Sequence, residues 1–214
     1  MYVKDHMTKN PFSVKTATSI SDARELMKQE KIHHLPVVDD KGGVIGIITE
    51  KDILCASPSQ ASTLDMWEIS TLLAKLEAGD VMTRKPIFCS PDTPVEEAAK
   101  ILADNDISGL PVVENGKLSG IITESDFFKV FIDLFSIREH GLRVTALVPD
   151  KPGELAELAG AIRDAGGNIL ALGFIRGDSF GTKLAVIKVT GVSEEELKKV
   201  ITPFVKEIDD IRQI

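Results

Sequence analysis

An internal repeat is the feature that most constrains how this chain can fold. When the sequence is shifted by 75 positions, Met7–Pro11 falls on Met82–Pro86 with the shared pattern MTxxP. With a shift of 74, Gly46–Asp52 falls on Gly120–Asp126 with the shared pattern GIITExD. Roughly 16 of about 45 aligned positions are identical, where chance would give about three. The first 131 residues therefore contain a duplicated unit.

Both copies predict the same order of elements. A helix starts near Ser19 in the first copy and near Thr93 in the second, each with apolar residues at helical spacing. Two short strands follow, joined by turns rich in Asp, Asn and Gly, and a further helix starts at Glu50 and at Glu124. The order β-α-β-β-α, found twice, gives two small sheets that should pack together as one module, because neither can bury a sizeable core alone. Between the copies, residues at helical spacing predict a connecting helix: Met66, Ile69, Leu72, Leu73 and Leu76.

The last third of the chain does not continue the repeat. Leu142–Val148 is predicted as a strand, followed by a turn and a helix that ends at Gly166-Gly167. Two further strands and a helix opened by a capping box at Ser193 come next, and Glu207–Ile214 is predicted as a final edge strand. The order βαββαβ is the ferredoxin-like arrangement.

Composition and charge exclude several classes of function. The net charge of −8 argues against a general nucleic-acid or membrane-surface binder, and 5% aromatic residues leave little for stacking on bases. Cys55 and Cys89 form neither a CxxC motif nor a zinc pattern, and both are expected to be buried small hydrophobes in a reducing cytoplasm. No apolar run has the length of a membrane span or the form of a signal peptide.

The repeated motifs resemble CBS domains, and the last third resembles an ACT domain. The first resemblance rests on MTxxP, on His33–Val38 and on GIITExD with their second copies; the second rests on Asp150-x-Pro152-Gly153-x-Leu155 and Gly167-Asn168-Ile169. The order CBS-CBS-ACT resembles the acetoin utilization protein AcuB group of regulators. The implied fold is α+β: two CBS units packed as one Bateman module, followed by a ferredoxin-like ACT domain. The implied boundaries are 3–54 for the first CBS domain, 55–77 for the linker with its helix, 78–138 for the second CBS domain and 141–214 for the ACT domain.

The resemblance implies an adenine nucleotide as regulatory ligand in the cleft between the two copies. A carboxylate can accept hydrogen bonds from both hydroxyls of a ribose cis-diol, and each copy contains one such aspartate. A threonine three residues before each aspartate can reach the ribose or the phosphate. In relatives the adenine lies against the segment after MTxxP of the opposite copy. One site is thus Thr49, Asp52, Ile87 and Phe88, and the other is Thr123, Asp126, Phe12 and Ser13.

The side chains that would face the phosphate differ between the copies. In relatives that sense AMP, basic residues precede the Leu-Pro-Val strand, where this chain has His33-His34 in the first copy and Ser108-Gly109 in the second. We therefore expect the Asp126 cleft to contain both imidazoles and the Asp52 cleft to contain neither. An adenine mononucleotide should then prefer the Asp126 cleft and bind more tightly near pH 6 than near pH 8.

Structural interpretations compete with these functional ones. Thr-x-x-Asp after a strand is also a helix-capping pattern, and the histidines could simply face solvent. In the last third, Asp150, Pro152, Gly153 and Asn168 are candidates for contacts with an effector such as an amino acid. Asn168 could equally end a helix, and Pro152-Gly153 could be only a turn.

Three classes of function follow from these features. The first is a regulatory sensor with no catalytic cofactor and no metal, which forms a homodimer and acts on an unidentified protein. The second is an assembly module that only dimerises. The third is an enzyme, for which the sequence contains no triad, P-loop or metal cluster. Neither nucleic acid nor a membrane is expected as a partner.

Overall fold

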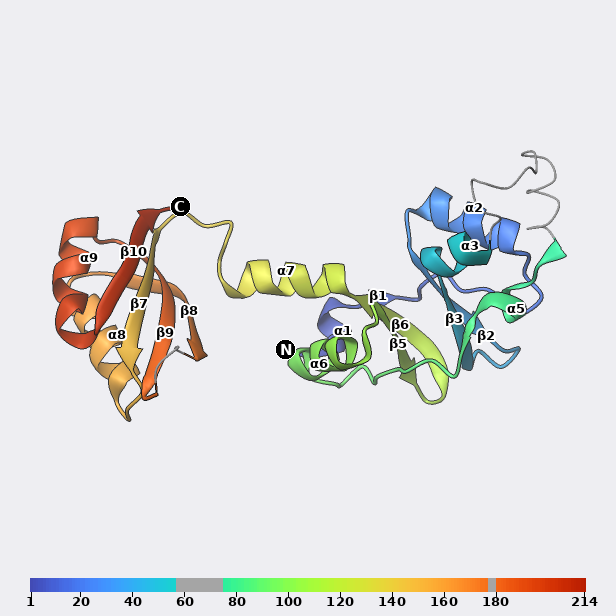
Figure 1. The fold of residues 1–214 in the computed structure, drawn as a ribbon, viewed down its shortest axis with the longest axis horizontal. Helices are drawn as coiled ribbons and strands as arrows, with labels where there is room; N and C mark the ends of the chain where they lie inside the picture. Colours follow the sequence, from blue (N-terminus) through green and yellow to red (C-terminus); the bar gives the residue numbers. More distant parts are fainter. Residues whose placement is uncertain (57–74, 177–179) are drawn as a thin grey trace. The chain divides into compact units, whose positions relative to one another are not determined.

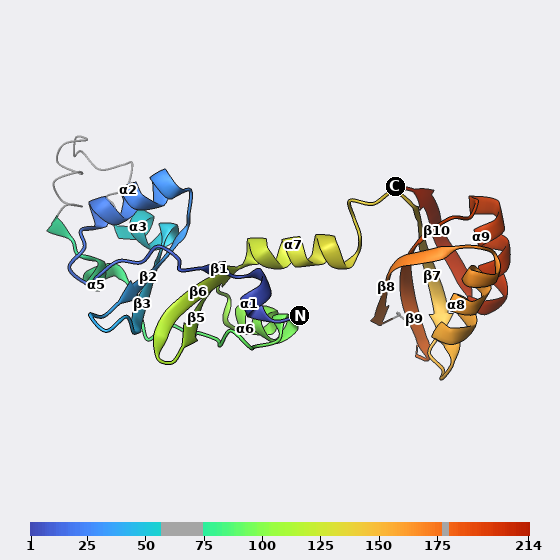
Figure 2. The same ribbon diagram turned by 180° about the vertical axis from the view of Figure 1, so that it is seen from behind.

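The computed structural model describes residues 1–56, 75–176 and 180–214, which form two compact units, 1–127 and 128–214 (Figures 1 and 2). Most of the predicted connecting helix, including Met66, Ile69, Leu72 and Leu73, lies outside the described residues. Leu76 is described and packs against the core of the first copy. Among the described helices, none is both long and apolar enough to cross a bilayer.

The first unit contains both copies of the repeat up to Phe127, within the last helix of the second copy, as the duplication predicts. The elements of the first copy are α1 (Val3–His6), β1 (Thr8–Lys9), α2 (Ile20–Glu30), β2 (His34–Val38), β3 (Val44–Thr49) and α3 (Glu50–Ala56). Those of the second copy are α5 (Ala78–Val81), β4 (Thr83–Arg84), α6 (Val95–Asn105), β5 (Gly109–Glu114), β6 (Lys117–Thr123) and α7 (Glu124–Leu134). The strands form two antiparallel three-stranded sheets, in the orders β2-β3-β4 and β1-β6-β5.

Each copy begins on the opposite copy's sheet. β1 pairs with β6, and β4 pairs with β3, so the first strand of each repeat is exchanged. In Figures 1 and 2 α1 accordingly lies beside α6, and its Val3 is fully buried in the core of the second copy. The chain then returns to its own copy at Val14, which bridges Val37, and at Cys89, which bridges Val112.

The exchange explains two motifs of the repeat. A Cβ added at Gly46 would collide with Sδ of Met82, and a Cβ added at Gly120 would collide with Sδ of Met7. The methionine of each MTxxP motif therefore packs on the glycine that opens GIITExD in the other copy. The two methionine side chains pack directly on the glycine backbones, and these two contacts help to hold the copies together.

The second unit has the predicted ferredoxin-like topology. Its elements are β7 (Leu142–Pro149), α8 (Glu154–Asp164), β8 (Asn168–Arg176), β9 (Thr182–Thr190), α9 (Glu194–Ile201), the 3₁₀ turn η1 (Thr202–Phe204) and β10 (Glu207–Gln213). The antiparallel strand order is β10-β7-β9-β8, so β10 is an edge strand as predicted. Alternate residues of β7 are buried under α8 and α9, which cover one face of the sheet.

Candidate functional site

A cavity of about 540 Å³ lies between the two copies of the repeat. It is lined by the end of β3 and start of α3, by the segment after β4, and by the turn before β5 of the second copy. The lining residues are His33, His34, Ile47, Thr49, Glu50, Lys51, Thr83, Lys85, Pro86, Ile87, Asp106, Ile107, Ser108, Gly109 and Glu124. The strand exchange places Ile87 here, because the chain crosses from β4 to its own copy at this point. The structure thus brings together Thr49, Ile87 and both histidines.

Thr49 and Asp52 form a closed hydrogen-bonded pair at the start of α3. The backbone N–H and the hydroxyl of Thr49 both donate to Oδ2 of Asp52, at 2.8 and 2.7 Å. The backbone N–H of Asp52 lies 3.3 Å from Oγ1 of Thr49, which accepts from it. The helix-capping interpretation of Thr-x-x-Asp is therefore correct, and it fixes a half-buried carboxylate beside the cavity.

Thr123 and Asp126 repeat this geometry at the start of α7, with distances of 3.0 and 2.9 Å to Oδ2. Asp126 is more deeply buried than Asp52, with only 7% of its surface exposed. Neither residue lines the cavity described above, and Asp52 does not line it either, although its bonding partner Thr49 does. Phe12, Ser13 and Phe88, whose side chains are exposed, are also absent from its lining.

The histidines lie in the cleft that contains Thr49, so the expectation that the Asp52 cleft would contain neither imidazole is wrong. Nδ1 of His33 lies 2.7 Å from Oε2 of Glu50. Nε2 of His34 lies 2.8 Å from Oγ of Ser108, so His34 links the copies. The reason is steric: a Cβ at Gly109 would lie 2.6 Å from the His34 ring, so the imidazole occupies space that only glycine leaves open.

Burial lowers the pKa of His34, so its imidazole favours the neutral form. Its pKa is lowered chiefly by desolvation and next by repulsion from His33, while the carboxylate of Asp52 opposes the change. Asp52 is therefore close enough to His34 to affect its charge, and an anion bound in the cavity would raise the pKa of the imidazole again.

The effector candidates of the second unit are only partly brought together. Asp150 and Gly153 line a cavity of about 560 Å³, and Nζ of Lys183 pairs with Asp150 at 2.7 Å. Pro152 belongs to the same turn, in which Gly153 has a φ of 88° that favours glycine. Asn168 pairs with Thr190, at the end of the sheet opposite Thr182 and Asp150. Within one chain it cannot share their site.

Sequence reasoning missed Glu154, which also lines this cavity. Only 5% of its surface is exposed, and neither carboxylate oxygen has a hydrogen-bond partner among the described residues. The nearest cation is Nζ of Lys151 at 3.8 Å. In a sequence, an acid in the first turn of a helix indicates only a favourable interaction with the helix dipole.

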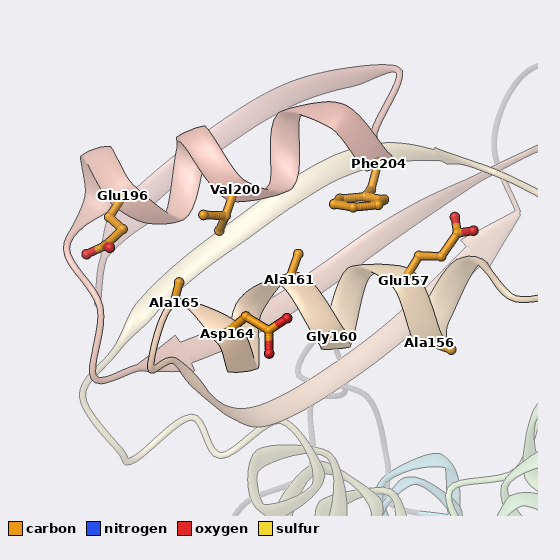
Figure 3. A pocket seen from close by; sticks show the side chains of 9 residues that line it. All are labelled: Ala156, Glu157, Gly160, Ala161, Asp164, Ala165, Glu196, Val200 and Phe204. Carbon is orange, nitrogen blue, oxygen red and sulfur yellow. The ribbon is translucent and has the colours of Figure 1, made fainter.

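A shallow groove runs between α8 and α9 (Figure 3). The small residues Gly160 and Ala161 on α8 line it together with Val200 on α9 and Phe204 of η1, and the polar lining consists of three carboxylates. Small residues allow the two helices to approach, so we interpret the groove as helix packing.

The cysteines differ from the expectation that both are buried. Cys89 is buried, and burial raises its pKa to about 11. Cys55 is exposed, because it lies on the outer face of α3. Within the described ranges no three His, Cys, Asp or Glu side chains are grouped so that they could hold a metal ion.

Comparison with known proteins assigns the first unit. The CBS domain family matches residues 3–59 and 78–133, which is more than half of the chain, so this protein belongs to the CBS domain family. CBS-pair proteins are generally regulatory.

Solved structures that resemble the chain over its CBS pair include the following three. A Vibrio cholerae protein assigned to acetoin utilization (AcuB) is 30% identical, with a TM-score of 0.54 over 64% of this chain and 95% of that one. CBSX2 of Arabidopsis thaliana, solved in complex with AMP, is 33% identical with a TM-score of 0.52, over 64% and 98% of the two chains. The CBS domain pair of protein MJ0100, in complex with 5′-methylthioadenosine and S-adenosyl-L-methionine, is 32% identical with a TM-score of 0.51, over 61% and 95%.

Some relatives are enzymes that carry a CBS pair as one part. L-Aspartate semialdehyde sulfurtransferase of Methanocaldococcus jannaschii is 32% identical over 60% of this chain, but this chain spans only 23% of that protein.

Proposed function

We propose that this protein is a regulatory sensor that binds an adenine nucleotide or a related adenosyl ligand between its CBS domains. The observation that carries the proposal is the cavity between the copies, where Thr49, Ile87 and His34 meet beside the carboxylate of Asp52. It is supported by relatives solved with AMP and with two other adenosyl ligands. The protein itself needs no catalytic cofactor for this role.

The chemistry of the cavity suits the three parts of such a ligand. Ile87 offers apolar surface to an adenine ring. Asp52 receives the ribose hydroxyls, because the bonds from Thr49 are made to Oδ2 and Oδ1 can face the sugar. His33 and His34 also line the cavity, and a protonated imidazole on either residue would attract the negative charge of a phosphate. A second, weaker site consists of Thr123, Asp126, Phe12 and Ser13.

Calorimetry with AMP, ATP, 5′-methylthioadenosine and S-adenosyl-L-methionine tests the proposal. At 100 times its dissociation constant, a ligand of the folded state should add about 2.7 kcal/mol to the free energy of unfolding. Binding that is lost in Asp52→Ala and kept in Asp40→Ala, an exposed turn residue, supports the site. No binding of any of the four would favour a module that only assembles.

The ferredoxin-like unit is proposed as an ACT domain that dimerises and binds a small effector. The buried Glu154 favours an amino acid, because its carboxylate could receive the ammonium group in the cavity beside Asp150 and Gly153. Asn168 would have to come from the partner subunit. Thermal shifts with the amino acids test this, and Gly153→Asp should abolish them.

We also propose that the protein is a homodimer. The edge strand β10 offers unpaired backbone groups, and both CBS pairs and ACT domains commonly pair with a second copy. Light scattering at micromolar concentration should give the mass of a dimer, and a monomeric mass would refute it. The proposed setting is the cytoplasm, with an unidentified protein as the regulated partner.

A further inference from the structure

The face of the second sheet that α8 and α9 leave open carries an unusual pair of cations. Arg143 on β7 and Lys188 on β9 are register partners, so their side chains stand next to each other on this face. Like charges placed directly opposite each other destabilise a sheet. Lys188 is also buried, with 4% of its surface exposed.

Neither cation is fully compensated by acids. Nζ of Lys188 donates to the backbone carbonyl of Ser136 at 2.8 Å, and no carboxylate of the described residues lies within ion-pair distance of it. Arg143 lies 3.6 Å from Asp210, whose carboxylate is already held by two closer bonds from Arg212. A buried charge without a counter-charge is costly, so the pair favours an anion.

Both cations line one end of a cavity of about 340 Å³ whose remaining walls are apolar. One wall is the segment after the middle of α7, with Phe131, Phe135 and Ile137. The other is β8, where the Phe135 ring rests on Gly173 so closely that a Cβ there would lie 2.8 Å from it. The volume is at the lower end of what small-molecule sites enclose.

We infer that this cavity binds a small carboxylate with an apolar tail. The carboxylate lies between Lys188 and Arg143, and the tail lies against Phe131, Phe135 and β8. This site is on the opposite face of the sheet from α8 and does not depend on nucleotide binding in the CBS pair. The competing interpretation is that Lys188 only ties the end of α7 to the sheet through Ser136.

Calorimetry on the full chain with hexanoate, octanoate and decanoate tests the inference, with octanol as the neutral analogue. We expect octanoate to bind and octanol to bind at least about tenfold more weakly. Lys188→Met keeps the apolar stem and should lose at least about tenfold in octanoate affinity. The exposed Lys199→Met is matched in charge and should lose nothing.

Three outcomes would overturn it: no binding of any of the three acids, equal binding of octanol, or unchanged affinity in Lys188→Met. If that variant does not fold, Arg143→Gln replaces it, because it leaves the contact between Lys188 and Ser136 intact. Octanoate affinity that is unchanged in Arg143→Gln would then overturn the inference, because the carboxylate is proposed to lie between the two cations.

Discussion

The two copies of the repeat share their motifs and differ where they meet. Each starts with a strand on the other's sheet, and each holds a Thr-x-x-Asp pair at the start of a helix. At the junction, however, the first copy has His34 and the second has Gly109, and the imidazole fills the space above the glycine. The two copies therefore share their backbone arrangement, but the His34 side chain gives the two clefts different chemical surfaces.

The sharpest contrast between the copies is in their cysteines. Cys55 is exposed, whereas Cys89 is buried and has a pKa of about 11, so at pH 8 very little of it is thiolate. In the folded protein we expect a thiol reagent to modify Cys55 completely while Cys89 stays intact. Mass spectrometry of the peptides checks this, and in denaturant both should react. Early labelling of Cys89 would mean that the second copy opens readily.

The next contrast is between the two aspartates. Because Asp52 lies beside the cavity and His34, Asp52→Ala should weaken AMP binding at least about tenfold, through loss of bonds worth roughly 1.5–3 kcal/mol each. Asp126→Ala should affect the same site much less. Calorimetry on both variants checks this. A larger loss in Asp126→Ala would restore the original expectation that the second cleft is preferred.

Much of the fold follows from sequence periodicity. α3 and α7 begin where the pattern predicts, and so do β7 and β10 in the second unit. A repeat shows which residues are equivalent, but it does not show which copy each strand joins. The exchange of β1 and β4 was therefore not predictable, although Met7 and Met82 carry its signal in their contacts with Gly120 and Gly46.

The candidate site was predicted less fully than the fold. Thr49 and Ile87 were candidates from the sequence and both line the cavity, and Asp52 is hydrogen-bonded to Thr49 without lining it. The position of His34 was not predictable, since it depends on the absence of a side chain at Gly109, 75 residues away in the sequence. The sequence did not predict a role for Glu154 or Lys188, because their burial, rather than their residue type, makes them unusual.

Adding a methyl group at the junction tests the steric difference between the copies. Gly109→Ala should push against His34 and destabilise the first unit by about 1–2 kcal/mol, since overpacking outweighs the gain from a stiffer unfolded chain. Gly79→Ala, whose new Cβ would meet Thr16 at an ordinary 3.4 Å, should cost less. Urea denaturation checks both.

A double variant decides the cause. If the imidazole is the obstacle, Gly109→Ala should cost much less when His34→Ala is also present. Simple addition of the two effects would place the strain elsewhere.

The smallest effect is the pH dependence that His34 brings. Its pKa is lower in the folded chain than the unfolded value of about 6.5, so the unfolded state binds more protons below that pH. Stability is therefore retained above about pH 6.5 and declines as the pH falls below it, by about 1.4 kcal/mol at most for each unit of difference. Denaturation between pH 7.5 and 5 should show a smaller decline in His34→Gln, and equal declines would refute this.

Binding of a phosphate-containing ligand should reverse the preference of His34 for its neutral form. A phosphate near His34 favours the protonated ring, so AMP should take up protons and bind more tightly at pH 6 than at pH 8. The neutral 5′-methyl sulfide of 5′-methylthioadenosine replaces the phosphate, so its affinity should change little over the same range. Calorimetry of both ligands, in wild type and in His34→Gln, separates the charge on the imidazole from the rest of the cavity. AMP affinity that does not change with pH would remove His34 from the phosphate end of the site and leave it only as the contact that joins the two copies.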